Sequence, residues 1–431
     1  MRCYDSYKDS GTEWIGNIPS HWGYTKLKYG FNIFSGATPN SDNVDYWDGD
    51  IIWVTPADYK TSDKYVYEGQ RSITKEGYMS CNTQIVPQGS IIFSKRAPIG
   101  SVAIAGNDLC TNQGCLSCVP NGMDSLFYYY ALSVFTEVFD LFGAGATFKE
   151  ISAKVFANFK MPTPPLSEQR VITAYLDVKC GDIDKAIATQ QKRIALLQEL
   201  RQSIITHAVT RGINPNVPLK NTGVDWIGMV PEHWSIMKTS LIFNNIGSGT
   251  TPKTSNTSYY TDSDGYNWLQ TGDLNDSIIF ETSKKVTSLA VKECNLRFYP
   301  KNSVVIAMYG ATIGKVGILA IDTSTNQACC VLPKSNKMLS KYAFYLYLSA
   351  KEPMLIESMG GGQPNISQDI IKKLKVPVPP LSEQAILVSY IEDHTASLDK
   401  SIAKADQQVK LLQELKQSLI TEVVTGKRKV C

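Results

Sequence analysis

Three short patterns in the sequence contain residue types that could carry out chemistry. The first is the C-x-x-C pair of Cys115 and Cys118, with Cys110 just before it, which could supply half of the ligands of a structural zinc site. Such a site usually needs a second ligand pair, and the four histidines of the chain lie far from these cysteines in the sequence. We therefore predict that these cysteines are reduced, buried thiols and that the protein holds no metal ion.

The second pattern is the segment GATIGKV from Gly310 to Val316, which has some letters of a phosphate-binding loop. It is one residue short between its glycines, and Val316 stands where Ser or Thr would bind a magnesium ion. The sequence also lacks the dinucleotide fingerprint G-x-G-x-x-G and the NPPY or NPPF tetrapeptide of adenine methyltransferases. We predict a turn beside a strand at Gly310, no cofactor, and a chain that is not itself an enzyme.

The third pattern pairs a histidine with a tryptophan, at His21 and Trp22 and again at His233 and Trp234. A catalytic histidine needs a partner that orients it, and the sequence identifies no such partner. Because the two histidines occupy the same place in two similar segments, we predict that each makes a structural hydrogen bond.

This recurrence extends over the whole chain. The segment SGTEWIGNIPSHW at residues 10–22 returns as NTGVDWIGMVPEHW at residues 221–234, and the spacing between matched motifs drifts only from 212 to 215 residues. A period this long indicates a tandem duplication of a folded unit rather than a solenoid of short repeats. The shorter motifs SGATP, TNQ and PPLSEQ, which begin at Ser35, Thr111 and Pro164, return as SGTTP, TNQ and PPLSEQ at Ser248, Thr325 and Pro379.

Each copy changes character at PPLSEQ. Before this motif, short apolar runs such as DIIWVTP, GSIIFS and NSVVIAMYG are bounded by Gly, Pro, Asn and Asp, which predicts a mixed, mainly β domain. Two aromatic-rich segments, residues 125–142 and 341–359, predict helices. We expect their tyrosines to pack in the core rather than to stack on bases, because an aromatic side chain buries a large area.

From PPLSEQ onward the pattern is helical. The prolines hold the chain extended, Ser167 or Ser382 is the predicted N-cap, and the glutamate that follows lies where the helix dipole favours a carboxylate. The leucine of the motif and the apolar residue five positions later have the spacing of a hydrophobic staple. A second cap is predicted at Asp182 and at Ser397.

The helical segments carry the apolar spacing of a coiled-coil seam, and each stops at a glycine, Gly212 or Gly426. The seam is interrupted at Gln190 and Arg201 in the first helix and at Lys416 in the second. Because each seam requires a partner, we predict that the two helices pair with each other in an antiparallel arrangement. The seam residues are Ile183, Ile187, Ile194, Leu197 and Ile204 in the first helix and Leu398, Ile402, Val409, Leu412 and Leu419 in the second.

The predicted fold class is therefore α+β, with two tandem α/β domains related by a pseudo-twofold axis and separated by two long antiparallel coiled-coil helices. The predicted boundaries are residues 1–165 for the first domain, 166–212 for the first helix, 213–380 for the second domain and 381–431 for the second helix.

A PPLSEQ motif that opens a helix twice, each time after a β-rich domain with W-I-G-x-x-P-x-H-W and S-G-x-T-P segments, resembles the specificity subunit of type I restriction-modification enzymes. The resemblance spans essentially the whole chain. It implies two target recognition domains that each read half of a bipartite DNA sequence, and helices that set the gap and dock two methyltransferase subunits. It further implies that a translocating endonuclease subunit can add to this complex and that the specificity subunit carries no chemistry.

Two domains that read different half-sites should share the residues that build the fold and differ where they touch bases. TNQ, W-I-G and S-G-x-T-P are therefore predicted to be mostly structural, and the loops at residues 94–100, 145–152, 307–314 and 362–367 are predicted to read DNA. Lysine and arginine could pair with guanine or phosphate, and glutamine and asparagine with adenine, while a solvated loop residue is the alternative for each. The candidate DNA-binding residues are Ser94, Lys95, Arg96, Thr147, Lys149, Lys253, Tyr309, Thr312, Gln363 and Asn365.

The net charge of the chain gives only limited support to the DNA-binding interpretation. The formal net charge is only +3 over 431 residues, far from the strongly basic balance of a non-specific binder. Residues 1–165 hold 13 basic and 16 acidic side chains (−3), and residues 213–380 hold 16 and 12 (+4). A two-headed coiled-coil scaffold without base-specific DNA binding remains the alternative. No apolar run is long enough to span a membrane, so we expect a cytoplasmic location.

Overall fold

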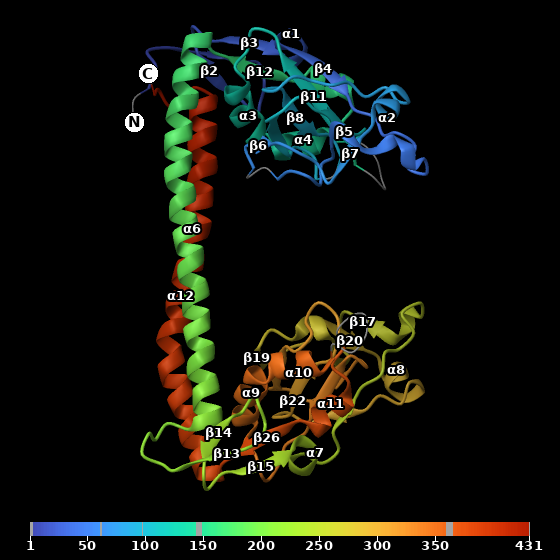
Figure 1. The fold of residues 1–431 in the computed structure, drawn as a ribbon, viewed down its shortest axis with the longest axis vertical. Coiled ribbons are helices and arrows are strands. Elements are labelled where there is room, and N and C mark those ends of the chain that lie inside the picture. The colour runs from blue at the N-terminus through green and yellow to red at the C-terminus, as the bar shows by residue number, and fades with distance from the viewer. Residues whose placement is uncertain (1–2, 61–62, 97, 144–148, 359–364, 431) are drawn as a thin grey trace. The chain divides into compact units, whose positions relative to one another are not determined.

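A computed structural model describes residues 3–60, 63–96, 98–143, 149–358 and 365–430. The chain forms two compact units, a first unit of residues 1–191 and 407–431 and a second unit of residues 192–406. Two long helices, α6 (Leu166–Arg211) and α12 (Leu381–Val424), each contribute one part to each unit (Figure 1). The predicted α+β fold of two tandem domains and two long helices is confirmed.

The first unit contains a five-stranded sheet in the order β4-β11-β8-β9-β6, a three-stranded sheet in the order β10-β5-β7, and the pairs β1-β2 and β12-β3. Its strands are β1 (Tyr7–Asp9), β2 (Asn17–Pro19), β3 (Gly23–Lys26), β4 (Phe31–Ser35), β5 (Trp47–Val54), β6 (Tyr65–Val66), β7 (Arg71–Ile73), β8 (Ile91–Ser94), β9 (Val102–Ala105), β10 (Cys110–Thr111), β11 (Cys115–Pro120) and β12 (Lys160–Thr163). Its shorter helices are α1 (Leu27–Gly30), η1 (Val44–Tyr46), α2 (Lys75–Met79), α3 (Ser125–Ser133), α4 (Thr136–Phe142) and α5 (Ala153–Ala157).

The second unit contains five-stranded sheets in the orders β16-β25-β22-β23-β19 and β17-β20-β18-β24-β21, with the pairs β13-β14 and β15-β26. Its strands are β13 (Leu219–Asn221), β14 (Met229–Pro231), β15 (Ser235–Lys238), β16 (Gly247–Ser248), β17 (Tyr260–Thr261), β18 (Tyr266–Leu269), β19 (Ser277–Ile279), β20 (Lys284–Val286), β21 (Phe298–Tyr299), β22 (Val304–Ala307), β23 (Val316–Leu319), β24 (Thr323–Thr325), β25 (Cys329–Leu332) and β26 (Lys375–Val378). Its shorter helices are α7 (Thr239–Ile242), η2 (Thr257–Tyr259), η3 (Thr271–Asp273), α8 (Ser288–Glu293), α9 (Ser340–Ser349), α10 (Lys351–Ser358) and α11 (Gln368–Lys373).

The two units repeat the topology of one five-stranded sheet, because β4, β11, β8, β9 and β6 correspond in order to β16, β25, β22, β23 and β19, whereas their second sheets have three and five strands. The aromatic-rich segments form α3 and α4 in the first unit and α9 and α10 in the second, as predicted. Their tyrosines are buried, among them Tyr128, Tyr130, Tyr342 and Tyr347, which confirms that they pack in the core.

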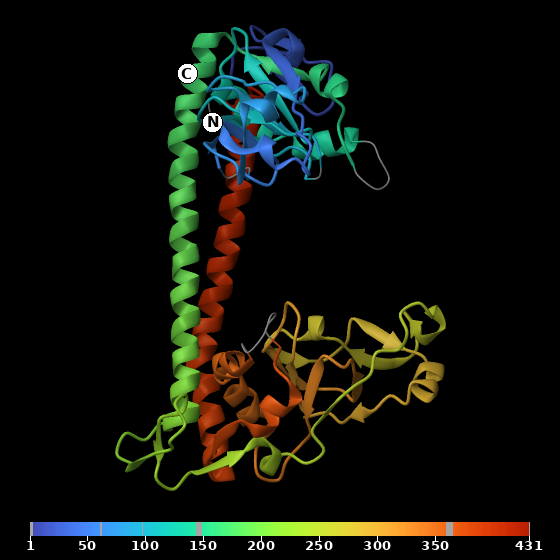
Figure 2. The same cartoon turned by 45° about the vertical axis from the view of Figure 1, so that its right-hand side comes forward.

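Both long helices belong to the hydrophobic core of each unit. In the first unit, Ile172 and Leu176 near the start of α6 share a cluster with Val423 and Val424 at the end of α12 and with Trp22. The start of one helix therefore packs beside the end of the other, which is the predicted antiparallel pairing (Figures 1 and 2). The second unit repeats this arrangement with the roles of the helices exchanged, through Leu387, Ile391, Ile205, Val209 and Trp234.

PPLSEQ starts each helix as predicted, but the predicted N-cap is wrong. The carbonyl of Pro165 accepts the first helical bond from the N–H of Gln169 (2.9 Å), so Ser167 lies inside the first turn. Pro380 and Ser382 repeat this arrangement in α12. Proline suits the start of a helix because its missing N–H would have no partner there.

The second caps predicted at Asp182 and Ser397 are also wrong, because α6 and α12 run through both positions without a break. No proline follows either residue within its helix, and packing along the helix offsets the cost of about 1 kcal/mol of the nearby helical Gly181. As predicted, a glycine with positive φ follows each helix, at Gly212 (+72°) and Gly426 (+74°).

The two charged residues that interrupt the seam both form ion pairs between the helices. Lys416 on α12 pairs with Asp184 on α6 at 2.7 Å in the first unit. Arg201 on α6 pairs with Asp399 on α12 at 2.7 Å in the second. The two pairs occupy matched positions of the duplication, so the charged residues that interrupt the apolar seam take part in the pairing of the two helices.

In the described part of the chain, no helix is both long and apolar enough to cross a membrane.

Candidate nucleic-acid interface

One end of the five-stranded sheet in the first unit gathers four loops. Strands β4 and β8 both end there, at Ser35 and Ser94, and the antiparallel strand β11 begins between them at Cys115. The N–H of Ile151 donates to the carbonyl of Lys95 (2.9 Å), which adds the loop before α5. The motifs SGATP and TNQ therefore lie beside the loop of residues 94–100, and we call this region the loop end of the unit.

The second unit has the same loop end. Strands β16 and β22 end there, at Ser248 and Ala307, and β25 begins between them at Cys329. The N–H of Ile366 donates to the carbonyl of Met308 (2.8 Å), which matches the bond between Ile151 and Lys95. The described parts of the predicted reading loops therefore lie at one end of the sheet in each unit, while residues 145–148 and 362–364 of these loops lie outside the described residues.

The first three candidate residues lie in a cluster whose positive charge is partly offset by one carboxylate. Ser94 is buried, and its hydroxyl donates to the carbonyls of Arg96 (2.9 Å) and Pro98 (3.1 Å), so it shapes the turn. Lys95 and Arg96 both pair with the carboxylate of Glu150, at 2.9 and 2.8 Å. Burial acts to raise the pKa of Glu150, but the hydrogen bonds from Arg96 and Lys95 outweigh it and hold this pKa below its usual range.

The other described candidate in this unit, Lys149, pairs with Asp140 at 2.5 Å. Thr147 lies outside the described residues. Sequence reasoning identified the cations of this loop end but missed their acidic partners. These partners are 54 and 9 residues away in the sequence, so local spacing gave no signal for them.

Among the described candidates of the second unit, which are Lys253, Tyr309, Thr312 and Asn365, no ion pair occurs. Tyr309 is partly exposed, and Lys253 and Asn365 are exposed. The hydroxyl of Thr312 donates to the carbonyl of Thr271 (2.9 Å), so this side chain supports its loop. Gln363 lies outside the described residues.

Matched positions of the two loop ends carry different chemistry. Because the backbone bonds of Ile151 and Ile366 coincide in the duplication, Arg96 corresponds to Tyr309 and Glu150 to Asn365. The first loop end therefore presents a guanidinium and a carboxylate where the second presents a phenol and an amide. One scaffold holds two different sets of hydrogen-bond donors and acceptors.

The shared motifs build this scaffold. A Cβ atom on Gly36 of SGATP would lie 2.2 Å from the carbonyl oxygen of Thr111 in TNQ, and one on Gly249 would lie 1.6 Å from that of Thr325. Only glycine allows this approach. The indole N–H groups of Trp53 and Trp268 fix the same segments by donating to the carbonyls of residues 37 (3.0 Å) and 250 (3.1 Å).

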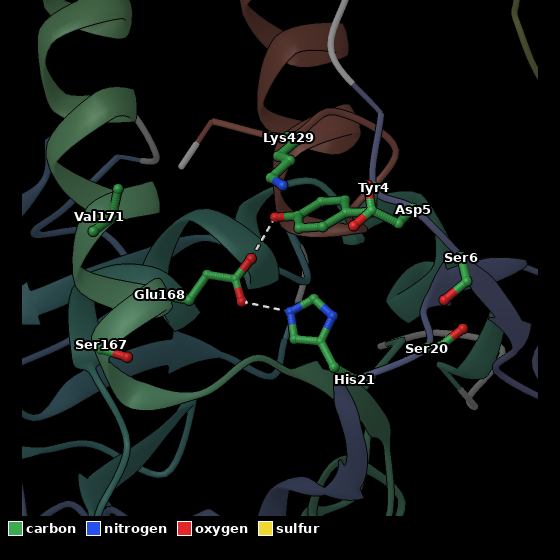
Figure 3. A pocket seen from close by; sticks show the side chains of 9 residues that line it. All are labelled: Tyr4, Asp5, Ser6, Ser20, His21, Ser167, Glu168, Val171 and Lys429. Atoms are coloured by element: carbon green, nitrogen blue, oxygen red, sulfur yellow. Dashed lines mark hydrogen bonds and ion pairs between the residues drawn. The ribbon is translucent and has the colours of Figure 1, made fainter.

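A second matched arrangement lies where each domain meets the start of its long helix. Figure 3 shows Glu168 of PPLSEQ between Tyr4 and His21, at the edge of a cavity that Lys429 also lines. The ring Nε2 of His21 lies 2.9 Å from one carboxylate oxygen of Glu168, and the hydroxyl of Tyr4 donates to the other (2.5 Å).

The second unit repeats this joint at Glu383. The Nε2 of His233 lies 2.7 Å from its carboxylate, and the indole N–H of Trp234 donates to it at 3.0 Å. Both histidines thus make the predicted structural hydrogen bond. Their partner is the glutamate that sequence reasoning had assigned only to the helix dipole, so PPLSEQ also fastens the helix to its domain.

The cysteines of the C-x-x-C pattern are buried thiols, as predicted. Burial raises the pKa of Cys110 and Cys115 to about 12 and also raises the pKa of Cys118, which disfavours the thiolate that zinc requires. No cluster of three or more potential metal ligands occurs among the described residues. GATIGKV forms the predicted turn, with positive φ at Gly310 and Gly314, between β22 and β23.

Each long helix also exposes an apolar pair that the seam analysis missed. Leu196 and Leu200 on α6 are 57% and 49% exposed, and Leu411 and Leu415 on α12 are 55% and 54% exposed. The two members of a pair are four residues apart and share a helix face. The pairs occupy matched positions of the duplication, so each long helix exposes an equivalent apolar face to solvent.

The chain matches the family model "Type I restriction modification DNA specificity domain" at residues 19–199 and again at 231–411. It is 24% identical to the Type I restriction enzyme MjaIX specificity subunit of Methanocaldococcus jannaschii, over 96% of this chain and 95% of that protein. It is also 24% identical to the Type I restriction enzyme EcoBI specificity subunit of Escherichia coli, over 70% of this chain and 65% of that protein.

Its fold is similar to a chain in the solved structure titled "Structural basis underlying complex assembly and conformational transition of the type I R-M system". The TM-score is 0.69 at 13% identity, with 94% of this chain and 98% of that chain covered. Because the family model matches twice, each time from a domain into its long helix, the chain belongs to the type I restriction-modification specificity family, as a specificity subunit that directs DNA target recognition and is not itself catalytic.

Proposed function

We propose that the chain reads a bipartite duplex DNA target, with one half-site at the loop end of each unit. The observation that carries this proposal is the replacement of Arg96 and Glu150 in the first loop end by Tyr309 and Asn365 at the matched positions of the second. One scaffold with two sets of donors and acceptors suits two different base sequences. The residues proposed for this DNA interface are Ser94, Lys95, Arg96, Thr147, Lys149, Lys253, Tyr309, Thr312, Gln363 and Asn365.

Five of these ten residues take one of two roles. The loop hydroxyls of Ser94 and Thr312 already donate to backbone carbonyls, so they act by holding the loops in the conformation that meets DNA. Arg96, Tyr309 and Asn365 present side chains at matched edges and are the residues that read bases.

The chain acts with two methyltransferase subunits, to which endonuclease and translocase subunits add in the cytoplasm. Two observations support such partners. The exposed leucine pairs of α6 and α12 recur at matched positions, and a leucine pair at four-residue spacing suits the apolar face of a partner helix. The small net charge of +3 and the ion pairs at the first loop end leave much of the phosphate contact to these partners.

The long helices set the number of unread base pairs between the half-sites. Each helix is continuous and contributes to both compact units, so its length constrains the path from one reading domain to the other. The ion pairs of Lys416 with Asp184 and of Arg201 with Asp399 fix the register in which the helices pair.

The test is to map methylated bases in cells that express the chain together with its methyltransferase subunits. We expect one bipartite motif with a fixed gap. A continuous motif, or methylation that does not depend on this chain, would refute the proposal. Mobility shifts of duplex DNA with and without the methyltransferase subunits separate it from the two-headed scaffold, which would show no preference for the mapped sequence in either case.

A further inference from the structure

A threonine and a glutamine meet at the same place in both loop ends. The hydroxyl of Thr38 in SGATP donates to the side-chain oxygen of Gln113 in TNQ. The hydroxyl of Thr251 in SGTTP donates to that of Gln327 in the second TNQ. We call these the Thr–Gln pairs. Sequence reasoning placed their motifs in the scaffold, but both glutamines and Thr38 are exposed to solvent.

The backbone under each pair is rigidly built. Gly36 and Gly249 allow the two segments to touch, and the indole N–H groups of the strand tryptophans hold one of them from the side. The side chains of Asn112 and Asn326 brace the other by accepting from the N–H groups two residues later, at 2.8 and 3.1 Å. These contacts fix the backbone position from which each glutamine side chain extends.

Each pair directly adjoins the residues that differ between the units. The N–H of Lys95 donates to the carbonyl of Gly114, one residue after Gln113 (2.9 Å). The N–H of Met308 donates to the carbonyl of Ala328, one residue after Gln327 (2.8 Å). A DNA duplex that reaches the differing residues therefore also reaches the Thr–Gln pairs.

In each pair, the side-chain NH₂ group of the glutamine can still donate hydrogen bonds. The threonine hydroxyl occupies the amide oxygen, and in the described part of the chain neither NH₂ group has a hydrogen-bond partner in the protein. Two half-sites of different sequence share their sugar–phosphate backbone, and uncharged glutamine side chains commonly donate to phosphate oxygens. A donor that occurs in both units therefore suits the phosphate backbone, which is the same in both half-sites.

We propose that Gln113 and Gln327 each donate a hydrogen bond to a DNA phosphate, and that Thr38 and Thr251 orient them for this contact. This inference rests on the proposed function and deepens it, because it separates residues that position the duplex from residues that read it. The exposed leucine pairs belong to the helices, so we assign the Thr–Gln pairs to DNA rather than to a methyltransferase subunit.

The test compares Gln113→Ala, Gln327→Ala and the double variant in complexes with the methyltransferase subunits. The probes are a random-sequence 40-base-pair duplex and a duplex that carries the mapped target. We expect each single variant to bind both probes about three- to tenfold more weakly, as for the loss of one hydrogen bond. The slope of log affinity against log salt should not change, because an uncharged donor releases no counterion. The methylated motif should also be unchanged.

Gln88→Ala is the matched control, because Gln88 is an exposed glutamine at the opposite end of strand β8. It should bind both probes like the wild type. Three results would overturn the inference: altered base preference in one half-site, normal DNA affinity with weaker methyltransferase assembly, or DNA affinity equal to that of the control. A wild-type complex that does not prefer the mapped duplex over the random one would instead refute the proposed function.

Discussion

The sequence indicated which single residues are important, but it did not indicate which residues they contact. The two histidines before tryptophan were correctly assigned to structural hydrogen bonds, because identical placement in two copies favours a common scaffold role. The acid that pairs with Lys95 and Arg96 was not foreseen. Glu150 reaches them only because the loop before α5 folds against the turn after β8, a contact between segments 54 residues apart.

This pairing predicts the effect of Glu150→Gln. The pKa of Glu150 is held low, so its carboxylate is charged at neutral pH and offsets the charge of Lys95 and Arg96. We expect the variant complex to bind random-sequence DNA more tightly, with a salt slope steeper by about one for each cation released to a phosphate. Salt titrations of the binding constant measure this. Asp108→Asn is the control, because Asp108 follows β9 at the opposite end of the sheet, and an equal gain there would argue against a local effect.

The differing residues predict separable effects on the half-sites. Arg96→Ala should relax or abolish recognition in one half-site only, with a cost of about 1–3 kcal/mol if the guanidinium contacts a guanine. Tyr309→Ala, at the matched position of the second unit, should affect only the other half-site. Methylation of substrate libraries randomised in one half-site at a time gives the readout. If either variant leaves kinetics and specificity unchanged, that residue is not a base reader.

At the scale of elements, the sequence predicted the helix start but not how the start is fixed. A proline pair before an amphipathic pattern marks the position well. The start is held by Gln169, however, which is buried and bridges the helix to its domain. Its side chain accepts from the N–H of Asp124 (3.0 Å) and donates to the carbonyl of Pro164 (2.8 Å). This contact to the start of α3 depends on tertiary structure, so a local motif does not contain it.

Gln169→Ala should therefore destabilise the first unit by about 2–3 kcal/mol, because it leaves a partly buried N–H and a buried carbonyl without partners. Ser167→Ala, two residues earlier, should change the free energy of unfolding by less than about 0.5 kcal/mol, since Ser167 is exposed in the first turn. Urea denaturation followed by tryptophan fluorescence compares the two variants. A larger loss from the serine variant would restore the N-cap interpretation.

At the scale of the whole molecule, duplication and fold class were readable because matched motifs recur across the entire chain. What the sequence did not reveal is that each compact unit contains parts of both helices. Leu419 and Val423 lie near the end of the chain, yet they pack in one core with Trp22 and Ile172. An apolar seam in the sequence shows that a helix must pack against another helix. Only the folded structure shows which turns of each helix belong to the core of which unit.

The division into units locates the best place to test the helices as a spacer. The units divide between Gln191 and Lys192 in α6 and between Asp406 and Gln407 in α12, which are matched positions of the duplication. An insertion at both places leaves the contacts within each unit intact. It also keeps the lengths of the two paired helices equal.

We predict that four helix-forming residues inserted at both places lengthen the unread gap of the target while both half-site sequences stay the same. Four residues add about 6 Å to a helix and rotate its end by only about 40° from full turns, a displacement of between one and two base-pair steps of about 3.4 Å. Methylation of substrates that differ only in spacer length measures the effect. Insertion into α6 alone is the control and should weaken the assembly, because the helices would then differ in length. An unchanged spacer preference in a stable, active double-insertion complex would show that other parts of the enzyme set the gap.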